Sequence, residues 1–266
     1  MKMSTSTYYY KSGRTEEKDL ALREQIERVI ELLPESGYRP VTAKLRETMQ
    51  VNGKRVLRVM GKYDLLCRKH RKFKVKTTQS NHRLRKYANI LKETQIDAPR
   101  QALVGDVTAF DIQGRDHYLA LLMDVFTREN LGMAVSDKND TALVLACLND
   151  AAANYPDIRG AIHHTDTDVR YCSALYVARA AELGLRMSMT VGNVYENAHA
   201  ESLNGTYKRQ EINVSDYTDK FIAAQSLFRF KKIYNTERPH SALGMMPPAV
   251  FRKNFEQKKT ERGLQS

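Results

Sequence analysis

Apolar residues in the first quarter of the chain recur at helical spacing. The positions that form the first predicted helix are Leu20, Ile26, Val29, Ile30 and Leu33. This helix is expected to stop at Pro34, and residues 37–40, Gly-Tyr-Arg-Pro, then break the chain. Residues 42–50 and 54–66 predict two further helices on either side of a tight turn. We expect Thr42 to cap the second of the three.

The third predicted helix has one apolar and one basic face. Its inward positions are Val56, Leu57, Val59 and Met60, and its outward positions are Lys54, Arg55, Arg58 and Lys62. Two short helices around an Asn-Gly turn, the second with a basic face, are typical of a helix-turn-helix unit that binds DNA. An ordinary helical hairpin with a solvated basic face remains the alternative.

Beyond residue 100, short apolar and β-branched runs alternate with helical patterns. The runs predict strands at 103–112, 117–124, 127–134, 160–165 and 185–189. The helical patterns lie at 141–155, 173–183, 196–212 and 219–235, the first opened by Asn139 or Asp140 and the third by Asn193 or Asn197. This order predicts an α/β fold, a mixed five-stranded sheet with flanking helices, preceded by a small all-α helical domain.

Two aspartates and a glutamate stand where these elements can bring them together. Asp106 lies inside the first predicted strand, and Asp166 lies where the fourth strand ends. Glu201 is on the helix at 196–212, with 34 residues between it and Asp166, and Lys208 follows two turns later on the same face. Three carboxylates can hold divalent cations and a lysine can hold a phosphate. Two-metal phosphoryl transfer on nucleic acid requires such a set.

Chance alone can also produce such a set, because the chain has 31 acidic residues. The other candidate acids are Asp111, Asp116, Asp124 and Asp168. Asp111 is an odd number of residues from Asp106, so in an unbroken strand the two face opposite sides of the sheet. Asp124 is the best rival because it also follows an apolar run, although an aspartate at a strand end is typical of a turn cap.

The excess positive charge belongs to the N-terminal part. The chain has 43 Lys and Arg against 31 Asp and Glu, a net charge of +12, and residues 1–100 hold 24 against 11, a net of +13. Residues 68–86 contain nine basic residues and no acid, which favours an extended, flexible linker. We expect this run to contact the DNA backbone, with an inert linker as the alternative. The residues expected to do so are Arg68, Lys69, Arg71, Lys72, Lys74 and Lys76.

Cysteine usage and hydropathy narrow the class of protein. Cys67, Cys147 and Cys172 are scattered and odd in number, which favours neither a disulfide framework nor a zinc finger. The sequence contains no secretory segment and no apolar run of membrane-spanning length. We therefore expect a protein of the reducing cytoplasm without a membrane partner.

Four segments resemble the conserved blocks of one known family. They are GDVTAF at Asp106; HHTDTDVRYCS at Asp166, usually written H-S-D-x-G-x-Q-Y; ENAHAESLNGTYKRQEI at Glu201; and YNTERPHSALGMMPPAVF, usually Y-N-x-x-R-P-H-x-x-L-x-x-x-x-P-x-x-F. In this order they make residues from about 100 to 252 resemble the integrase-type core of OrfB insertion-sequence transposases, which are close to retroviral integrases. The chain departs from the family pattern at Asp168, which replaces Gly, at Glu196, which replaces Asp, and in having no Trp before Asp106.

The resemblance implies an RNase H-like fold and a DDE transposase that cleaves and joins DNA strands. Asp106, Asp166 and Glu201 would hold two Mg²⁺ ions, with Mn²⁺ as an alternative metal, and Lys208 would anchor a phosphate. Arg238 and His240 of the last block would contact DNA, with plain packing as the alternative. The expected domains are a helix-turn-helix-like DNA-binding domain at 1–66, a basic linker at 67–99, the catalytic core at 100–252 and a basic C-terminal tail at 253–266.

The resemblance also implies partners. They are double-stranded DNA at the element's ends and at the target, further copies of the chain in a homo-oligomer on DNA, and a first-frame OrfA partner or frameshift fusion. Such a protein would work in the bacterial cytoplasm, associated with the nucleoid. Two alternatives remain, a non-catalytic DNA-binding regulator of the element's ends and a nuclease of RNA–DNA hybrids. The Arg-Pro-His block argues against the nuclease.

Overall fold

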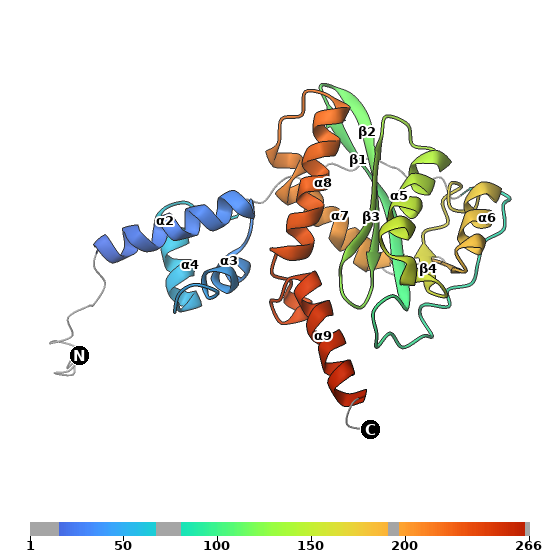
Figure 1. The fold of residues 1–266 in the computed structure, drawn as a ribbon. Helices are drawn as coiled ribbons and strands as arrows, with labels where there is room; N and C mark the ends of the chain where they lie inside the picture. Colours follow the sequence, from blue (N-terminus) through green and yellow to red (C-terminus); the bar gives the residue numbers. More distant parts are fainter. Residues whose placement is uncertain (1–15, 68–80, 191–196, 264–266) are drawn as a thin grey trace, which may run out of the picture. The chain divides into compact units, whose positions relative to one another are not determined.

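The computed structural model describes residues 16–67, 81–190 and 197–263 (Figure 1). The chain divides into two compact units, Met1–Lys69 and His70–Ser266, which are described separately. Within the described residues, no helix combines the length and the apolar character needed to cross a bilayer.

The first unit contains three helices, α2 (Glu16–Leu32), α3 (Tyr38–Leu45) and α4 (Gly53–Lys62). They pack around a small apolar core. Its fully buried members are Ile26, Val41, Val56, Val59 and Met60. Asn52 starts α4, because its side chain accepts a hydrogen bond from the backbone N–H of Lys54.

The second helix begins and ends earlier than predicted. Tyr38 to Pro40 form its first turn instead of breaking the chain. The first backbone N–H groups of a helix have no intrahelical partner, so a proline there removes no hydrogen bond. Thr42 is not the cap, because its hydroxyl donates to the Tyr38 carbonyl within the helix. Leu57, predicted to face inward, is 40% exposed, since it lies beside the stripe formed by residues 56, 59 and 60.

The second unit is built on one mixed sheet. Its strands are β1 (Ala102–Ile112), β2 (Arg115–Asp124), β3 (Asn130–Ser136), β4 (Ile162–Thr165) and β5 (Arg186–Met189). The order across the sheet is β3-β2-β1-β4-β5, with β1, β2 and β3 antiparallel and β1, β4 and β5 parallel. The predicted five-stranded mixed sheet is therefore confirmed. The third strand starts later than predicted because residues 125–129 form a turn that Asp124 closes.

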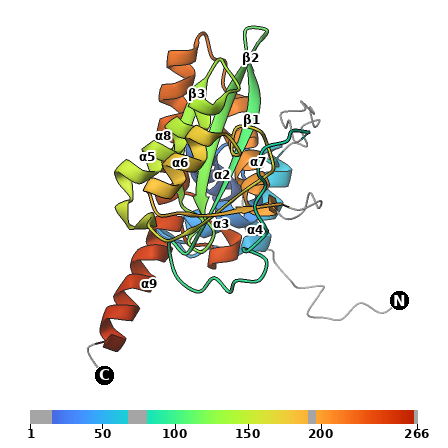
Figure 2. The same ribbon diagram turned by 90° about the vertical axis from the view of Figure 1, so that its right-hand side faces the viewer.

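Helices cover both faces of this sheet (Figure 1). The helices α5 (Thr141–Asn154) and α6 (Ala174–Glu182) pack on one face, and they lie in front of the strands in Figure 2. The helices α7 (Ala198–Gln210) and α8 (Lys220–Thr236) pack on the other face. Short 3-10 turns lie at Pro156–Ile158, Ile212–Val214 and Ser241–Leu243.

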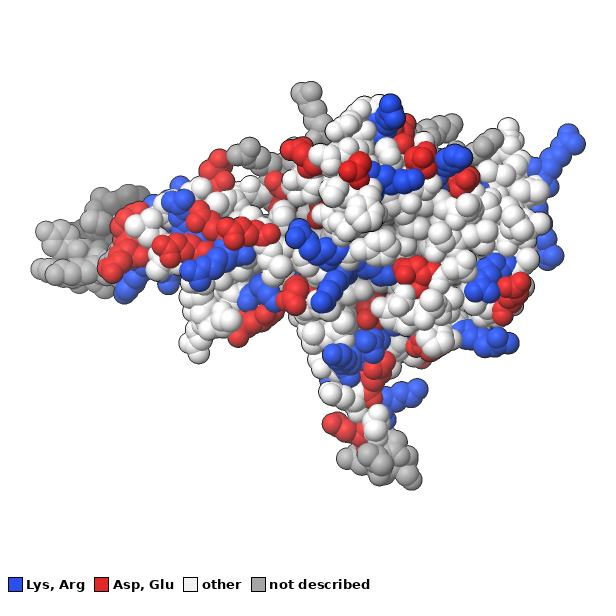
Figure 3. Space-filling view, turned by 45° about the horizontal axis from the view of Figure 1, so that its top comes forward, with Lys and Arg blue, Asp and Glu red and all other residues white. Residues whose placement is uncertain are grey.

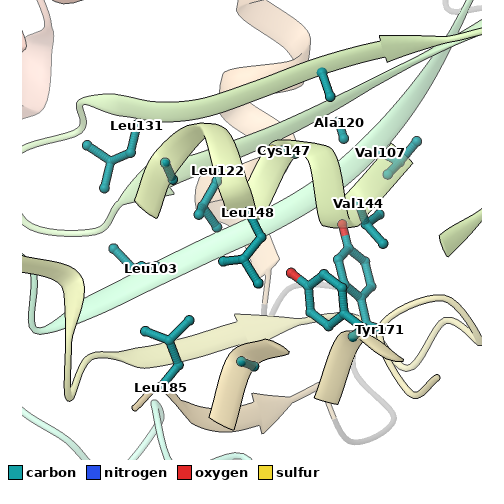
Figure 4. Close-up of a cluster of buried hydrophobic side chains, with 14 of the residues drawn as sticks. Leu103, Val107, Ala120, Leu122, Leu131, Val144, Cys147, Leu148, Tyr171 and Leu185 are labelled. Atoms are coloured by element: carbon teal, nitrogen blue, oxygen red, sulfur yellow. The ribbon is translucent and has the colours of Figure 1, made fainter. Parts of the chain in front are cut away.

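The core on the α5 side joins helix and sheet closely. Figure 4 shows Leu103 and Leu122 of the sheet facing Val144 and Leu148 of α5. A glycine at position 132 allows this approach, because a Cβ atom there would lie 2.3 Å from the carbonyl oxygen of Cys147. This close approach packs α5 directly on β3.

The segments before and after the sheet pack on the same unit. Residues 81–99 contain no helix or strand, yet Ile90 and Leu91 lie against the α7–α8 core. After the sheet, α9 (Pro248–Gly263) begins with ring contacts from Phe251 and Phe255 to Phe126, at centroid distances of 5.6 and 5.0 Å. Residues 253–263, which were expected to begin a basic tail, therefore form the rest of α9.

A buried ionic network ties these outer segments to the sheet. Arg100 donates to Asp124 at 3.2 Å and to Glu129 at 3.1 Å, and its side chain is 5% exposed. The hydroxyl of Thr127 donates to Asp124 at 2.6 Å, and Arg252 of α9 donates to Glu129 at 3.0 Å. The carboxylates of Asp124 and Glu129 are almost fully buried, so these partners are needed to stabilise their ionised forms.

We predict that Arg100→Met lowers the free energy of unfolding by about 3–5 kcal/mol, because it leaves buried Asp124 and Glu129 without their shared cation. Urea denaturation of the full chain measures this change. Arg115→Met, at an exposed position at the start of β2, is the control and should change stability little. Equal stability of the two variants would contradict the prediction.

Candidate active site

Strand register brings Asp106 and Asp166 together. The parallel pairing of β1 with β4 aligns Leu103 with His163 and Val104 with His164. Asp106 and Asp166 each lie two residues beyond this last aligned pair, and Asp166 directly follows the end of β4. Neighbouring strands are about 4.8 Å apart and aligned residues face the same side, so the two carboxyl groups lie on the same face of the sheet.

The helix α7 carries the third acid to the same strand. Asn197, Glu201, Asn204 and Lys208 recur at spacings of three and four residues, so they share one helix face. Asn204 Nδ2 donates to Asp106 Oδ2 at 2.8 Å, and Asn197 Nδ2 donates to the carbonyl of the adjacent Gly105 at 3.3 Å. These bonds dock that face on β1 beside Asp106. Glu201 lies between the two asparagines and is exposed to solvent.

The pKa of Asp106 shows the influence of the nearby acids. Burial, and then the charges of Asp166 and Glu201, raise the pKa of its carboxyl to about 7, while a hydrogen bond from the Val107 N–H and the charge of Arg170 act in the opposite direction. Burial also lowers the pKa of Lys208, which the charge of Asp106 opposes. Asp166, Glu201 and Lys208 therefore each lie within electrostatic reach of Asp106, and the two other acids repel its carboxylate.

The donor set suits a divalent cation. Carboxylate oxygens are the ligands that Mg²⁺ prefers, and a cation would relieve the repulsion that raises the pKa of Asp106. Among the residues that the structure describes, no three Asp, Glu, His or Cys side chains stand close enough together to enclose one ion. Asp166 Oδ1 accepts a hydrogen bond from the backbone N–H of Asp168 at 3.2 Å, which orients the second acid.

The competing acids have other partners. Asp124, the strongest alternative to the predicted acids, is fully buried and bonded to Arg100. It is therefore a structural residue that caps a turn, which was the alternative interpretation of its position. Asp111 is exposed and accepts a hydrogen bond from the N–H of Gly114 in the β1–β2 hairpin. Asp116 is exposed near the same hairpin. His163 and His164, which precede Asp166 on β4, are fully buried and lie within hydrogen-bond distance of Tyr176 and Ser188, respectively.

The basic residues predicted on α4 differ in their contacts. Lys54 is exposed, and Arg55 donates to the carbonyl of Lys18. Arg58 forms two hydrogen bonds to Asp19, at 2.8 and 2.6 Å, and holds the pKa of that carboxyl at about 2. Lys62 donates to Glu16 at 2.5 Å. The residues expected to bind DNA from the basic run, Arg68, Lys69, Arg71, Lys72, Lys74 and Lys76, lie outside the described residues.

Arg238 and His240 belong to a cluster that the sequence did not reveal. Arg238 donates to Gln210 at 2.7 Å and its guanidinium stacks on Tyr234. Burial, and then the charges of Arg238, Arg128 and His199, lower the pKa of His240 to about 4. Arg128 and His199 form a 2.5 Å hydrogen bond across 71 residues of sequence. That separation explains why sequence spacing could not find the pair.

Elsewhere on the second unit, charges of both signs alternate. On the face shown in Figure 3, Lys and Arg side chains are interspersed with Asp and Glu. This agrees with the near-zero net charge of the sequence beyond residue 100, where 19 Lys and Arg meet 20 Asp and Glu. Basic side chains are therefore concentrated locally in the cluster described above, which contains Arg128, His199, Arg238 and His240.

Comparisons with known proteins identify the family. An HTH-like domain matches residues 17–73, and the integrase core domain matches residues 96–192 and 183–248. The chain is 33% identical over 225 residues to "Insertion element IS600 uncharacterized 31 kDa protein" of Shigella sonnei, covering 83% of this chain and 82% of that protein. It is 32% identical over 222 residues to the transposase for insertion sequence element IS904 of Lactococcus lactis, covering 80% of this chain and 85% of that protein. The chain belongs to the insertion-sequence transposases with an integrase core.

This membership confirms the family, the helix-turn-helix-like domain and the DDE transposase function expected from the motifs. The transposase is accordingly an enzyme of the polynucleotidyl transferase class, and its family is metal-dependent. A third relative, the transposase for insertion sequence element IS629 of Shigella sonnei, is 30% identical over 269 residues, covering 95% of this chain and 89% of that protein.

Two solved integrase structures are also similar. The first is the HTLV-2 integrase catalytic core domain in complex with magnesium, with 13% identity, a TM-score of 0.44, and coverage of 58% of this chain and 97% of that chain. The second is a simian T-cell lymphotropic virus intasome in complex with PP2A regulatory subunit B56 gamma, with 13% identity, a TM-score of 0.49, and coverage of 85% of this chain and 74% of that chain. Family membership rests on the sequence matches.

Sequence reasoning also missed Asn204, although its spacing from Glu201 and Lys208 places it on the same helix face as these candidate residues. We predict that Asn204→Ala lowers strand joining by about 10–100-fold, because partners that orient metal-binding carboxylates have effects of this size. The concentration of Mg²⁺ needed for half-maximal joining should rise. Ser202→Ala, at an exposed position on the same helix, is the control, and equal joining by both variants would contradict the assignment.

Proposed function

We propose that the transposase cleaves and joins DNA strands at Asp106, Asp166 and Glu201, with Lys208 beside them. The observation that carries this proposal is the docking of α7 on Asp106 through Asn204, together with the β1–β4 pairing that ends two residues before both aspartates. Each acid comes from a different element, so their convergence depends on the fold. Asp166 and Glu201 repel the Asp106 carboxylate, and a bound cation would relieve this repulsion.

Two Mg²⁺ ions, or Mn²⁺, held by the three carboxylates would activate a water or a DNA 3′-hydroxyl as nucleophile and stabilise the leaving oxygen. Asn204 and the Val107 N–H hold the Asp106 carboxylate in one orientation. Lys208 acts as a point charge that binds a phosphate next to the scissile bond. No side chain bonds covalently to DNA in this scheme, which is consistent with the buried positions of Tyr171 and Tyr176 near the site.

DNA would be held by several parts of the chain. We assign DNA binding to the helical domain at 1–66 and to the basic linker at 67–99, and catalysis to the core at 100–252, followed by the basic tail at 253–266. In the core, Arg238 and His240 would contact a phosphate together with Arg128 and His199. The positive charges of Arg128 and Arg238 would attract this phosphate.

The substrate would be double-stranded DNA at the element's ends and at its target. Joining two ends requires more than one DNA-bound copy, so a homo-oligomer on DNA is part of this proposal, and an OrfA partner or fusion would add further DNA contacts. The reaction takes place where the chromosome is, in the bacterial cytoplasm at the nucleoid. The competing function is a regulator that binds the element's ends through its helical domain without cutting them.

We predict that Asp106→Asn, Asp166→Asn and Glu201→Gln each abolish strand cleavage and joining and leave DNA binding intact. Each substitution removes a negative charge while keeping the side-chain shape. A gel assay with labelled end DNA and Mg²⁺, run beside a filter-binding assay, measures both properties. Joining at the normal rate by any one variant would remove that residue from the catalytic set. Wild-type protein that binds but never cleaves would favour the regulator.

On the helical domain, we predict different outcomes for two basic residues of α4. Lys54→Gln should weaken DNA binding and reduce the slope of log affinity against log salt by about one, because an exposed lysine can release one phosphate counterion. Arg58→Gln should lower the melting temperature, because it removes both guanidinium hydrogen bonds from Asp19 and leaves only the longer contact to Lys62. The same binding and melting measurements on both variants test this. Equal effects on melting would contradict it.

A further inference from the structure

A buried ion pair lies next to the second catalytic acid. Arg170 Nε donates to Asp168 Oδ1 at 2.5 Å, and the backbone N–H of Arg170 donates to the same oxygen at 3.0 Å. The two side chains are 5% and 1% exposed. A charge so well shielded from water is stable only when it is paired, so each partner depends on the other.

The pair is joined to the catalytic acid on one side and to the next element on the other. The backbone N–H of Asp168 donates to Asp166 Oδ1 at 3.2 Å. The Arg170 guanidinium also donates to the side-chain oxygen of Asn139, just before α5. The turn that carries Asp166 is therefore connected through Arg170 to the loop between β3 and α5. A shift of either partner would move the oxygen atoms of Asp166.

Asp168 and Arg170 are charged residues at two positions where the family pattern has neutral residues. In H-S-D-x-G-x-Q-Y, Asp168 occupies the Gly position and Arg170 the Gln position. One departure adds a negative charge and the other a positive charge, so together they leave the local charge unchanged. Arg170 also acts electrostatically on Asp106 and Asp166. Either departure alone would leave an unbalanced buried charge beside the catalytic acids.

We propose that Asp168 and Arg170 act as one exchangeable unit, in which Arg170 is a positioning residue that neutralises Asp168 and holds the turn carrying Asp166. This inference rests on the proposed catalytic role of Asp106, Asp166 and Glu201. It explains how the site keeps its metal-binding charge although an acid stands at the usual glycine. The competing role for Asp168 is a fourth metal ligand, but Oδ1 already accepts two hydrogen bonds from Arg170.

A double-mutant cycle on the full chain tests the unit. The variants are Asp168→Gly, Arg170→Gln and the two combined, with the exposed pair Arg179→Gln and Glu182→Gln as the matched control. Three properties are measured: Mn²⁺ binding without DNA by electron paramagnetic resonance, the melting temperature, and strand cleavage on end DNA. Mn²⁺ binding reports on the site without any catalysis.

Asp168→Gly should weaken Mn²⁺ binding by about 10–100-fold, because the unbalanced Arg170 cation then repels the metal. Arg170→Gln should lower the melting temperature and cleavage, because the buried Asp168 carboxylate loses the charge and the hydrogen bond of the guanidinium. The double variant should recover all three properties to within about threefold of wild type, which is the non-additivity expected of a coupled pair. The Arg179 and Glu182 control should change none of them.

The proposal would be overturned if the losses of the two single variants added up in the double variant. It would also be overturned if Asp168→Gly and Arg170→Gln both matched wild type in all three properties. Loss of Mn²⁺ binding in both Asp168→Gly and the double variant would instead assign Asp168 as a ligand, which also overturns it. If Arg170→Gln does not fold, the comparison of Asp168→Gly with the double variant still decides, because only a coupled pair recovers Mn²⁺ binding. Mn²⁺ binding that persists in Asp166→Asn would instead contradict the proposed metal site itself.

Discussion

The parallel pairing of β1 with β4 is the constraint on which the rest of the site depends. It brings the segments that carry Asp106 and Asp166 side by side, although 59 residues of sequence lie between these two acids. Side chains alternate along a strand, so a shift of one residue would turn one of the two acids to the opposite face. The apolar residues of β1 enforce the register, because alternate positions fill two different cores, one under α5 and one under α7.

Bringing these acids together costs free energy, and neighbouring polar groups limit that cost. Burial and the charges of Asp166 and Glu201 disfavour the ionised form of Asp106, while its hydrogen bonds to Asn204 and to the Val107 N–H hold the carboxylate in place. Arg170 supplies positive charge nearby and is itself balanced by Asp168. The site therefore combines repulsion that a cation can relieve with a rigid arrangement of the groups that would bind it.

Much of the positive charge of the described helical domain has a structural use. On α4, Arg58 and Lys62 bind Asp19 and Glu16 of α2 and so hold the two helices together. In the catalytic unit, Arg100 and Arg252 neutralise buried carboxylates and attach the flanking segments to the sheet. A count of basic residues therefore overstates the charge that is free to meet DNA. Lys54, exposed on α4, is the kind of residue that remains available.

The sequence by itself determined the element order, the mixed sheet, the family and the residue types of the site. These features depend on local periodicity and on motifs within short segments, such as the apolar run around Asp106 or the block around Glu201. Tertiary structure alone decided which buried charges pair. It showed Asp124 as a partner of Arg100, Asn204 as a partner of Asp106, and Arg128 as a partner of His199. These contacts join residues 24, 98 and 71 positions apart. Hydrogen bonding acts over about 3 Å in space, and spacing along one chain does not encode such a distance once the chain has folded back on itself.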